Sequence, residues 1–122
     1  MLNKESKRQL EEAESLNNKP PYEISFEEAR KQFSKTKEIF PLPEVEIKHI
    51  ENKKIFVNNS EINIRIFSNL DDSIQPLLVN FHGGGWVFGD LDSDDSMCRE
   101  LSKLSGRKVI SIDYRLSPEN KF

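Results

Sequence analysis

Three consecutive glycines, Gly83-Gly84-Gly85, lie between His82 and Trp86, directly after an apolar stretch. Consecutive glycines carry a high conformational entropy cost on folding. Such a run is useful where backbone N–H groups must approach a ligand closely, as donors to an anion or to a developing oxyanion do. The alternative is a flexible turn between a strand and a helix.

Two phosphate-binding motifs do not fit this loop. A Walker loop needs a lysine followed by Ser or Thr, and no lysine follows these glycines. The dinucleotide-binding fingerprint needs a glycine where this sequence has Phe88. The pattern that does match is the His-Gly-Gly-Gly oxyanion loop of esterases and lipases, which follows the third strand of an α/β-hydrolase.

The other chemistry-bearing residues favour structural roles. Cys98 has no candidate base beside it, so we expect an inert, buried thiol. His49 alternates with Val45 and Ile47, which is typical of a sheet residue. No metal site or cofactor is expected, because the aspartates at 90, 92, 94 and 95 lack the glycine and the terminal glutamate of a calcium loop. They suit a solvated loop and a helix N-terminus.

The composition excludes several classes of function. The chain has 122 residues, 18 Lys and Arg against 21 Asp and Glu, and 35% hydrophobic residues, enough for one domain. The net charge of -3 gives no basic field, so nucleic acid is not an expected partner. The single cysteine allows no internal disulfide, and no apolar run is long enough for a membrane span or a secretory signal. We expect a cytoplasmic chain.

Residues 1–43 predict a helical segment. Spacing of three between apolar residues favours an amphipathic helix over 4–17, ended by Pro20 and Pro21. Ser25 and Glu28 form a capping box that opens a second helix, closed by Pro41.

After Pro43 the hydrophobic period changes to two, which predicts a β-hairpin turning at Asn58-Asn59, with Val45 and Ile47 already on its first strand. Two apolar runs, 77–81 and 109–114, flank a helix in which Met97, Leu101 and Leu104 share helical spacing before Gly106 ends it. Strand, helix and strand with apolar faces predict a buried parallel pair and an α/β fold over 44–122.

The stretch 77–122 closely resembles the hormone-sensitive-lipase-like family of bacterial esterases. Two motifs carry the resemblance: His82 to Trp86, and the run Asp-Tyr-Arg-Leu-Ser-Pro-Glu from Asp113 to Glu119. Ser117 stands where the family usually has alanine, and Asn80 where it has an apolar or aromatic residue. The resemblance implies an α/β-hydrolase fold, of which this chain would hold the helical cap segment (1–43), the hairpin and the parallel strand-helix-strand (44–122), about half of the full sheet.

The resemblance also implies roles for single residues. The backbone N–H groups of Gly83 and Gly84, and possibly Gly85, would donate to the oxyanion of a tetrahedral intermediate, and His82 would brace the loop. Trp86 would pack beneath the loop or along the acyl pocket. The turn residues Asp113, Arg115 and Glu119 are expected to hold the chain rather than touch substrate.

The first two helices resemble the family's cap, which lies over the acyl pocket. Its aromatic residues either line that pocket or pack against their own helix, and packing is the favoured interpretation: Phe26, Phe33 and Phe40. Phe33 and Trp86 are the candidate substrate-binding side chains.

No serine of the sequence lies in a Gly-x-Ser-x-Gly elbow, and both histidines precede the expected position of a catalytic base. We therefore expect the N-terminal portion of a carboxylesterase or lipase that hydrolyses short to medium acyl esters through an acyl-serine intermediate. This truncated chain would be inactive alone. The missing C-terminal half would be a same-frame continuation or a second chain, and strand 108–114 would keep an exposed edge. The alternatives are a ligand-binding relative without catalysis, as the plant gibberellin receptors are on a similar fold, and an inactive remnant.

Overall fold

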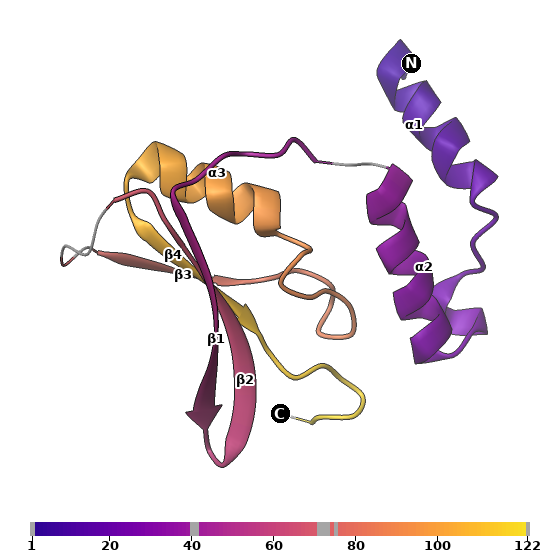
Figure 1. Ribbon diagram of the computed structural model, residues 1–122. Helices are drawn as coiled ribbons and strands as arrows, with labels where there is room; N and C mark the ends of the chain where they lie inside the picture. The colour runs from indigo at the N-terminus through magenta and orange to yellow at the C-terminus, as the bar shows by residue number, and fades with distance from the viewer. Residues whose placement is uncertain (1, 40–41, 71–73, 75, 122) are drawn as a thin grey trace. The chain divides into compact units, whose positions relative to one another are not determined.

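The computed structural model describes residues 2–39, 42–70, 74 and 76–121, except the side chains of 37–39. Its elements in chain order are α1 (Lys4–Ser15), η1 (Pro21–Glu23), α2 (Phe26–Ile39), β1 (His49–Val57), β2 (Ser60–Ser68), β3 (Leu77–Phe81), α3 (Asp95–Ser105) and β4 (Lys108–Asp113) (Figure 1). They form two compact units that divide between residues 41 and 42. Each unit is described by itself below.

The N-terminal unit is helical, and both of its long helices have side-chain caps. The amide of Ser6 donates to Asn3 Oδ1 at 2.8 Å at the start of α1. At the start of α2 the capping box is confirmed, since Ser25 N donates to Glu28 Oε2 and Glu28 N donates to Ser25 Oγ, both at 3.2 Å. Ala29 is buried, whereas Phe26 and Phe33 are about half exposed. Phe40, the third aromatic residue of the predicted cap, lies outside the described residues.

The second unit contains a four-stranded sheet in the order β1-β2-β4-β3. β1 and β2 are antiparallel and join at Asn58 and Asn59, whose φ angles of 48° and 62° are those of the predicted hairpin turn. β3 and β4 form the predicted parallel pair. One prediction was wrong: β4 has no free edge, because β2 pairs with it antiparallel on its other side, and β3 is the edge strand. Another boundary differs, since β1 begins at His49, after Val45 and Ile47.

The core lies between the sheet and α3, which packs against β4 and β2 (Figure 1). Phe67 of β2, Cys98 of α3 and Val109 of β4 are fully buried and form one cluster. The helix ends as predicted at Gly106, whose φ of 62° is left-handed. The three large apolar residues that indicated this helix are not buried, however. Cys98 and Ser102, one turn apart, face the sheet instead, and Met97, Leu101 and Leu104 remain exposed.

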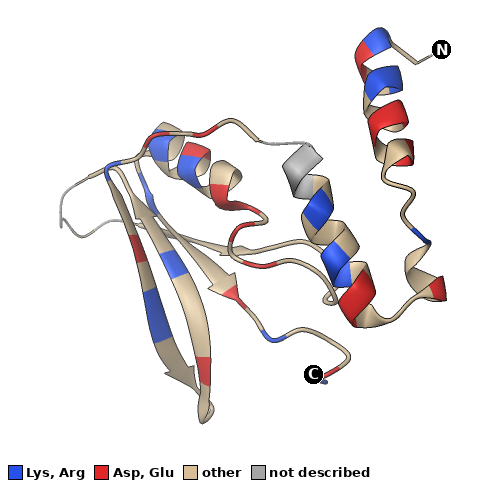
Figure 2. Cartoon of the chain, turned by 45° about the vertical axis from the view of Figure 1, so that its right-hand side comes forward, with Lys and Arg blue, Asp and Glu red and all other residues tan. Residues whose placement is uncertain are grey.

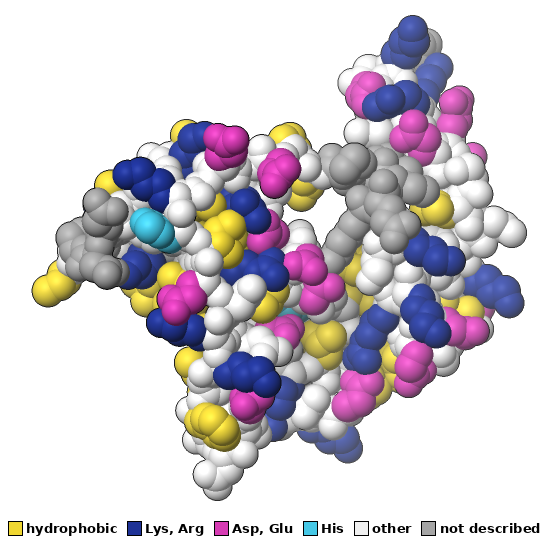
Figure 3. Space-filling view, in the orientation of Figure 1, with side chains coloured by type: hydrophobic (Ala, Val, Ile, Leu, Met, Phe, Trp, Pro, Cys, Tyr) yellow, Lys and Arg dark blue, Asp and Glu magenta, His cyan; other side chains and the backbone are white. Residues whose placement is uncertain are grey.

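β3 was predicted to be buried on both faces, and in this chain it is not. Leu77, Val79 and Phe81 are 48%, 51% and 65% exposed. Strand side chains point to the faces of the sheet, and α3 packs against β4 and β2 rather than over this edge strand. On the face that Figure 3 presents, by contrast, hydrophobic side chains are scattered among charged ones (Figure 3).

Candidate functional site

The glycine loop begins where β3 ends. A pocket of about 420 Å³ lies over it, lined by Phe81, His82, Gly83, Gly84, Gly85, Trp86 and Tyr114. Phe81 ends β3 and Tyr114 directly follows β4, so the carboxyl ends of the two parallel strands bring these residues together. The structure thus places five consecutive candidate residues of the first motif in one pocket with Tyr114 of the second.

The loop folds tightly back on itself. The carbonyl oxygen of Gly84 accepts hydrogen bonds from Val87 N at 3.1 Å and from Phe88 N at 2.9 Å. Gly84 has a φ of +128°, a conformation that side chains rarely allow, and a Cβ there would collide with the Phe88 carbonyl. Glycine at this position is therefore required by the loop's own fold. A Cβ on Gly83 would meet nothing within 4 Å.

Sequence reasoning gave Gly89 no role, yet it is part of this construction. Its φ is +99°, and a Cβ on Gly89 would collide with the imidazole of His82. The loop therefore closes onto the histidine at its beginning. Besides this φ, a contact across seven residues requires glycine here, and no local spacing pattern could have signalled that contact.

His82 is buried, with 3% of its surface exposed. Its Nδ1 lies 2.9 Å from the Gly83 carbonyl oxygen. A carbonyl can only accept, so the hydrogen bond requires the proton to be on Nδ1. The other ring nitrogen, Nε2, is buried with no hydrogen-bond partner in the described part of the chain. These contacts are consistent with the expected bracing of the loop.

Tyr114 contacts the same histidine twice. Its ring stacks on the imidazole with 4.3 Å between centroids and 15° between planes, and its hydroxyl donates to the His82 carbonyl oxygen at 2.8 Å. Burial, with a smaller contribution from the negative charge of Asp94, raises the pKa of Tyr114. The phenol therefore keeps its proton at neutral pH. Tyr114 lies within the second motif of the sequence, where no role was predicted for it.

Trp86 lines the pocket but does not pack beneath the loop, because 75% of it is exposed. Its backbone has a φ of 62°, and its carbonyl oxygen accepts from Ser117 N at 2.8 Å. This bond ties the first motif to the second. Phe33, the other candidate substrate-binding residue, belongs to α2 in the N-terminal unit, and its role stays a prediction.

The acidic residues after the loop lead into the predicted helix N-terminus, and their side chains have partners. Figure 2 shows acidic residues on the segment that leads into α3. Arg65 of β2, with 18% of its side chain exposed, bridges Asp92 at 2.7 Å and Asp95 at 2.6 Å. Burial alone would lower the pKa of Arg65, but its hydrogen bonds to the two aspartates raise it overall.

Two further aspartates fix the segment from other sides. Asp94 accepts a hydrogen bond from Asn80 Nδ2 of β3 at 3.1 Å. Asn80, which departs from the family pattern, therefore binds the segment before α3. Asp90 accepts from Ser93 Oγ at 2.9 Å. Among the described residues no group of three or more His, Cys, Asp or Glu side chains could hold a metal ion.

Asp113 and Arg115 of the second motif contact β2 rather than the pocket. Asp113 accepts from Asn63 Nδ2 at 3.1 Å, and Arg115 donates to Ser60 Oγ at 3.2 Å. Cys98 is buried, and burial above all, with the charge of Asp94, raises the pKa of its thiol to about 11. This agrees with an inert thiol rather than a nucleophile.

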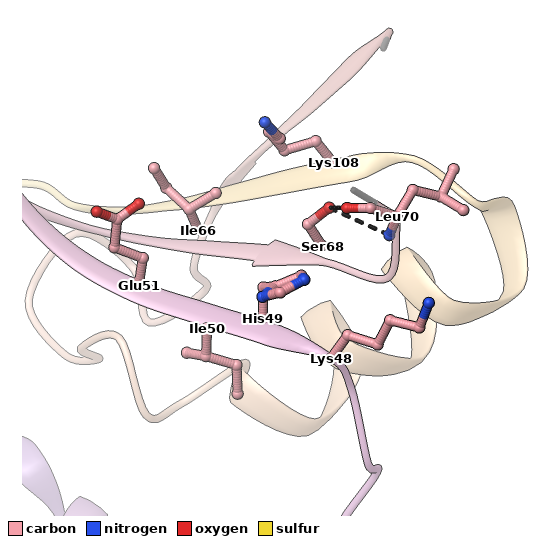
Figure 4. A pocket seen from close by; sticks show the side chains of 8 residues that line it. All are labelled: Lys48, His49, Ile50, Glu51, Ile66, Ser68, Leu70 and Lys108. Atoms are coloured by element: carbon pink, nitrogen blue, oxygen red, sulfur yellow. Dashed lines mark hydrogen bonds between the residues drawn. The ribbon is translucent and has the colours of Figure 1, made fainter. Parts of the chain in front are cut away.

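His49 lies in a different pocket of about 440 Å³ at the start of β1 (Figure 4). Lysines contribute to its wall from two elements, Lys48 before β1 and Lys108 of β4. The Ser68 hydroxyl there donates to the Leu70 carbonyl at 2.9 Å, as the dashed lines show. His49 is a sheet residue as predicted.

No helix in the described residues is long and apolar enough to cross a membrane.

Comparisons with known proteins match the same part of the chain. A family model described as the alpha/beta hydrolase fold matches residues 78–122. An arylesterase of Saccharolobus solfataricus is 37% identical over 81 residues, which are 66% of this chain and 26% of that protein. A versiconal hemiacetal acetate esterase of Emericella nidulans is 37% identical over 83 residues, 68% of this chain and 27% of that protein. The chain thus spans about a quarter of these relatives.

Solved structures agree. A structure of an arylesterase superposes with a TM-score of 0.85 at 30% identity, covering 99% of this chain and 39% of the other. An ester hydrolase from the metagenome of Lake Arreo superposes with a TM-score of 0.83 at 33% identity, covering 100% of this chain and 40% of the other. Fold and motif agree in these matches: residues 78–122 match the α/β-hydrolase fold, and the chain is similar to part of the length of known esterases.

Proposed function

We propose that the glycine loop is the oxyanion hole of a carboxylesterase that hydrolyses short to medium acyl esters through an acyl-serine intermediate. The observation that carries this proposal is the state of three consecutive amides. Within the described part of the chain, the N–H groups of Gly83, Gly84 and Gly85 donate no backbone hydrogen bond, and the three residues line a pocket. Unpaired backbone donors are costly unless water or a ligand accepts from them.

The chemistry follows from the polarity of these groups. When a serine hydroxyl attacks an ester carbonyl, negative charge develops on the carbonyl oxygen. N–H donors already aimed at that position stabilise the charge without reorganisation. The apolar wall of Phe81 and Trp86 suits an acyl chain.

The other parts of the reaction would come from outside this chain. None of its serines lies in a nucleophile elbow, so the catalytic serine, acid and histidine are proposed to belong to a continuation of the polypeptide or to a second chain. Residues 1–43 are proposed as the cap, with 44–122 as the first half of the hydrolase core. A reducing compartment such as the cytoplasm is part of the proposal, in keeping with the free, buried Cys98.

Gly83 offers a matched test of the oxyanion donors in the complete enzyme. Its Cβ position is open, so Gly83→Ala keeps the N–H at little structural cost, whereas Gly83→Pro removes the N–H. We expect kcat on a p-nitrophenyl acyl ester to fall by about 100- to 1000-fold for Gly83→Pro, the usual loss for one oxyanion donor. Gly83→Ala should stay within a few-fold of the parent. Equal activity of both variants would refute the oxyanion assignment.

A second assay concerns the chain alone. We expect the purified 122-residue chain to hydrolyse the same ester no faster than buffer does. Turnover well above the buffer rate would show that the missing half is not required.

A further inference from the structure

Three successive carbonyl oxygens of the loop are each held by a hydrogen bond. The His82 carbonyl accepts from the Tyr114 hydroxyl at 2.8 Å, and the Gly83 carbonyl accepts from His82 Nδ1 at 2.9 Å. The Gly84 carbonyl accepts from Val87 N and Phe88 N, at 3.1 Å and 2.9 Å. The donors therefore come from one distant residue, one side chain of the loop and the loop's own backbone.

Each of these bonds also sets the direction of an amide. A trans peptide group is planar, so the N–H of one residue points opposite to the carbonyl of the residue before it. Holding the carbonyls of residues 82, 83 and 84 therefore fixes the N–H groups of Gly83, Gly84 and Gly85. Each N–H then points away from the donor that holds its peptide plane.

We propose that Tyr114 is a positioning residue of the oxyanion loop. Its hydroxyl orients the Gly83 N–H by holding the His82 carbonyl, and its ring orients the Gly84 N–H by holding the stacked His82 imidazole. This inference rests on the function proposed above. Tyr114 touches neither substrate nor reacting atoms in this role.

The two contacts of Tyr114 act on different amides. Its hydroxyl holds the peptide plane between His82 and Gly83 directly. Its ring, stacked 4.3 Å from the imidazole, keeps Nδ1 directed at the Gly83 carbonyl. Glycine at position 89 also leaves room for the His82 imidazole, since a Cβ on residue 89 would collide with it.

Tyr114→Phe separates these contacts, because phenylalanine keeps the stacked ring and loses only the hydroxyl. In the complete enzyme we expect kcat to fall by about 10- to 100-fold with KM within about twofold, since misaimed donors weaken binding of the transition state and not of the ester. Ser105→Ala is the control, because it too removes one hydroxyl that donates to a carbonyl, that of Leu101, but at the exposed end of α3. It should leave both constants unchanged.

A double variant tests whether Tyr114 acts through the Gly83 amide. If it does, Tyr114→Phe added to Gly83→Pro costs no further activity, because the donor that the tyrosine aims is already gone. Additive losses of activity in the double variant would overturn the role of Tyr114 and would not affect the oxyanion assignment of Gly83. Full activity of Gly83→Pro alone would instead refute the proposed function, so the two failures are distinguishable.

A measurement on the 122-residue chain itself needs no catalysis. The amide nitrogen of Gly83 belongs to the same peptide group as the His82 carbonyl, so its resonance reports on the Tyr114 hydrogen bond. We expect Tyr114→Phe to shift the Gly83 amide resonance and to leave that of Gly106, beyond the end of α3, in place. An unchanged Gly83 resonance would overturn the proposal, and so would an equal shift at both glycines, which would indicate a general loss of structure.

Discussion

The hairpin turn at 58–59 and the glycine loop at 82–89 both leave a strand through left-handed backbone. The turn does so with two asparagines, at φ angles of 48° and 62°. The loop uses glycines at 84, 85 and 89, yet it also places Trp86 at a φ of 62°. A φ near +60° therefore does not by itself require glycine in this chain.

The difference lies in what surrounds the backbone. Asparagine tolerates left-handed geometry at modest cost, and the turn leaves its side chains room in solvent. Gly84 and Gly89 lie where a Cβ would collide with the Phe88 carbonyl and with the His82 ring. The turn needs only a φ near +60°, whereas the loop needs space and, at Gly84 and Gly89, a larger positive φ.

The largest effect expected from this comparison is that of Gly84→Ala. A φ of +128° is accessible almost only to glycine, and the added Cβ would collide with backbone that cannot easily move. We expect the free energy of unfolding of the chain to fall by about 3 kcal/mol, measured by urea denaturation.

Gly83→Ala is the control for this variant, because it adds the same methyl group one residue earlier, in open space. It should change the free energy of unfolding by less than about 0.5 kcal/mol. Equal losses from the two alanines would show that crowding does not distinguish the glycines of the loop.

The next effect concerns the ion pairs near each segment. Arg65 holds Asp92 and Asp95 beyond the loop with 18% of its side chain exposed, whereas Lys54 and Glu61 of the hairpin pair at 2.6 Å with both side chains largely exposed. We expect Arg65→Met to lower the free energy of unfolding by about 2 kcal/mol.

Lys54→Met, the matched variant in the hairpin, should cost no more than about 0.5 kcal/mol, since water screens an exposed pair. Urea denaturation at low and high salt checks both values. A loss from Lys54→Met as large as that from Arg65→Met would contradict the contrast between the two regions.

The smallest effect is that of Asn59→Ala in the hairpin turn. Alanine at a φ of 62° loses the asparagine's tolerance of this conformation, and we expect a loss of about 1 kcal/mol. Asn59→Gly should match or slightly exceed the stability of the parent. A gain from Asn59→Ala would mean that the turn does not depend on left-handed geometry.

Local patterns in the sequence predicted much of this fold. The capping box at Ser25, the turn at Asn58 and the helix end at Gly106 each depend on a few neighbouring residues, and all three were correct. The glycine loop was found in the same way.

Predictions that depend on distant contacts fared worse. Hydrophobic spacing identified α3 from Met97 and Leu101, but the residues of α3 that are buried are Cys98 and Ser102. Small residues can approach the sheet closely, and a pattern that counts only large apolar side chains overlooks them. Gly89 and Tyr114 were missed as parts of the site because each acts on His82 from 7 or more residues away.

The burial of Cys98 turns the chain's single cysteine into a built-in reporter. Thiol reagents react with the thiolate, and a pKa raised to about 11 together with complete burial suppresses this form in the folded chain. Labelling must then wait for the space between α3 and the sheet to open, so its rate measures that opening without any introduced probe. Because burial raises the pKa of the folded thiol to about 11, above that of the thiol in the unfolded chain, alkali should also favour the open form.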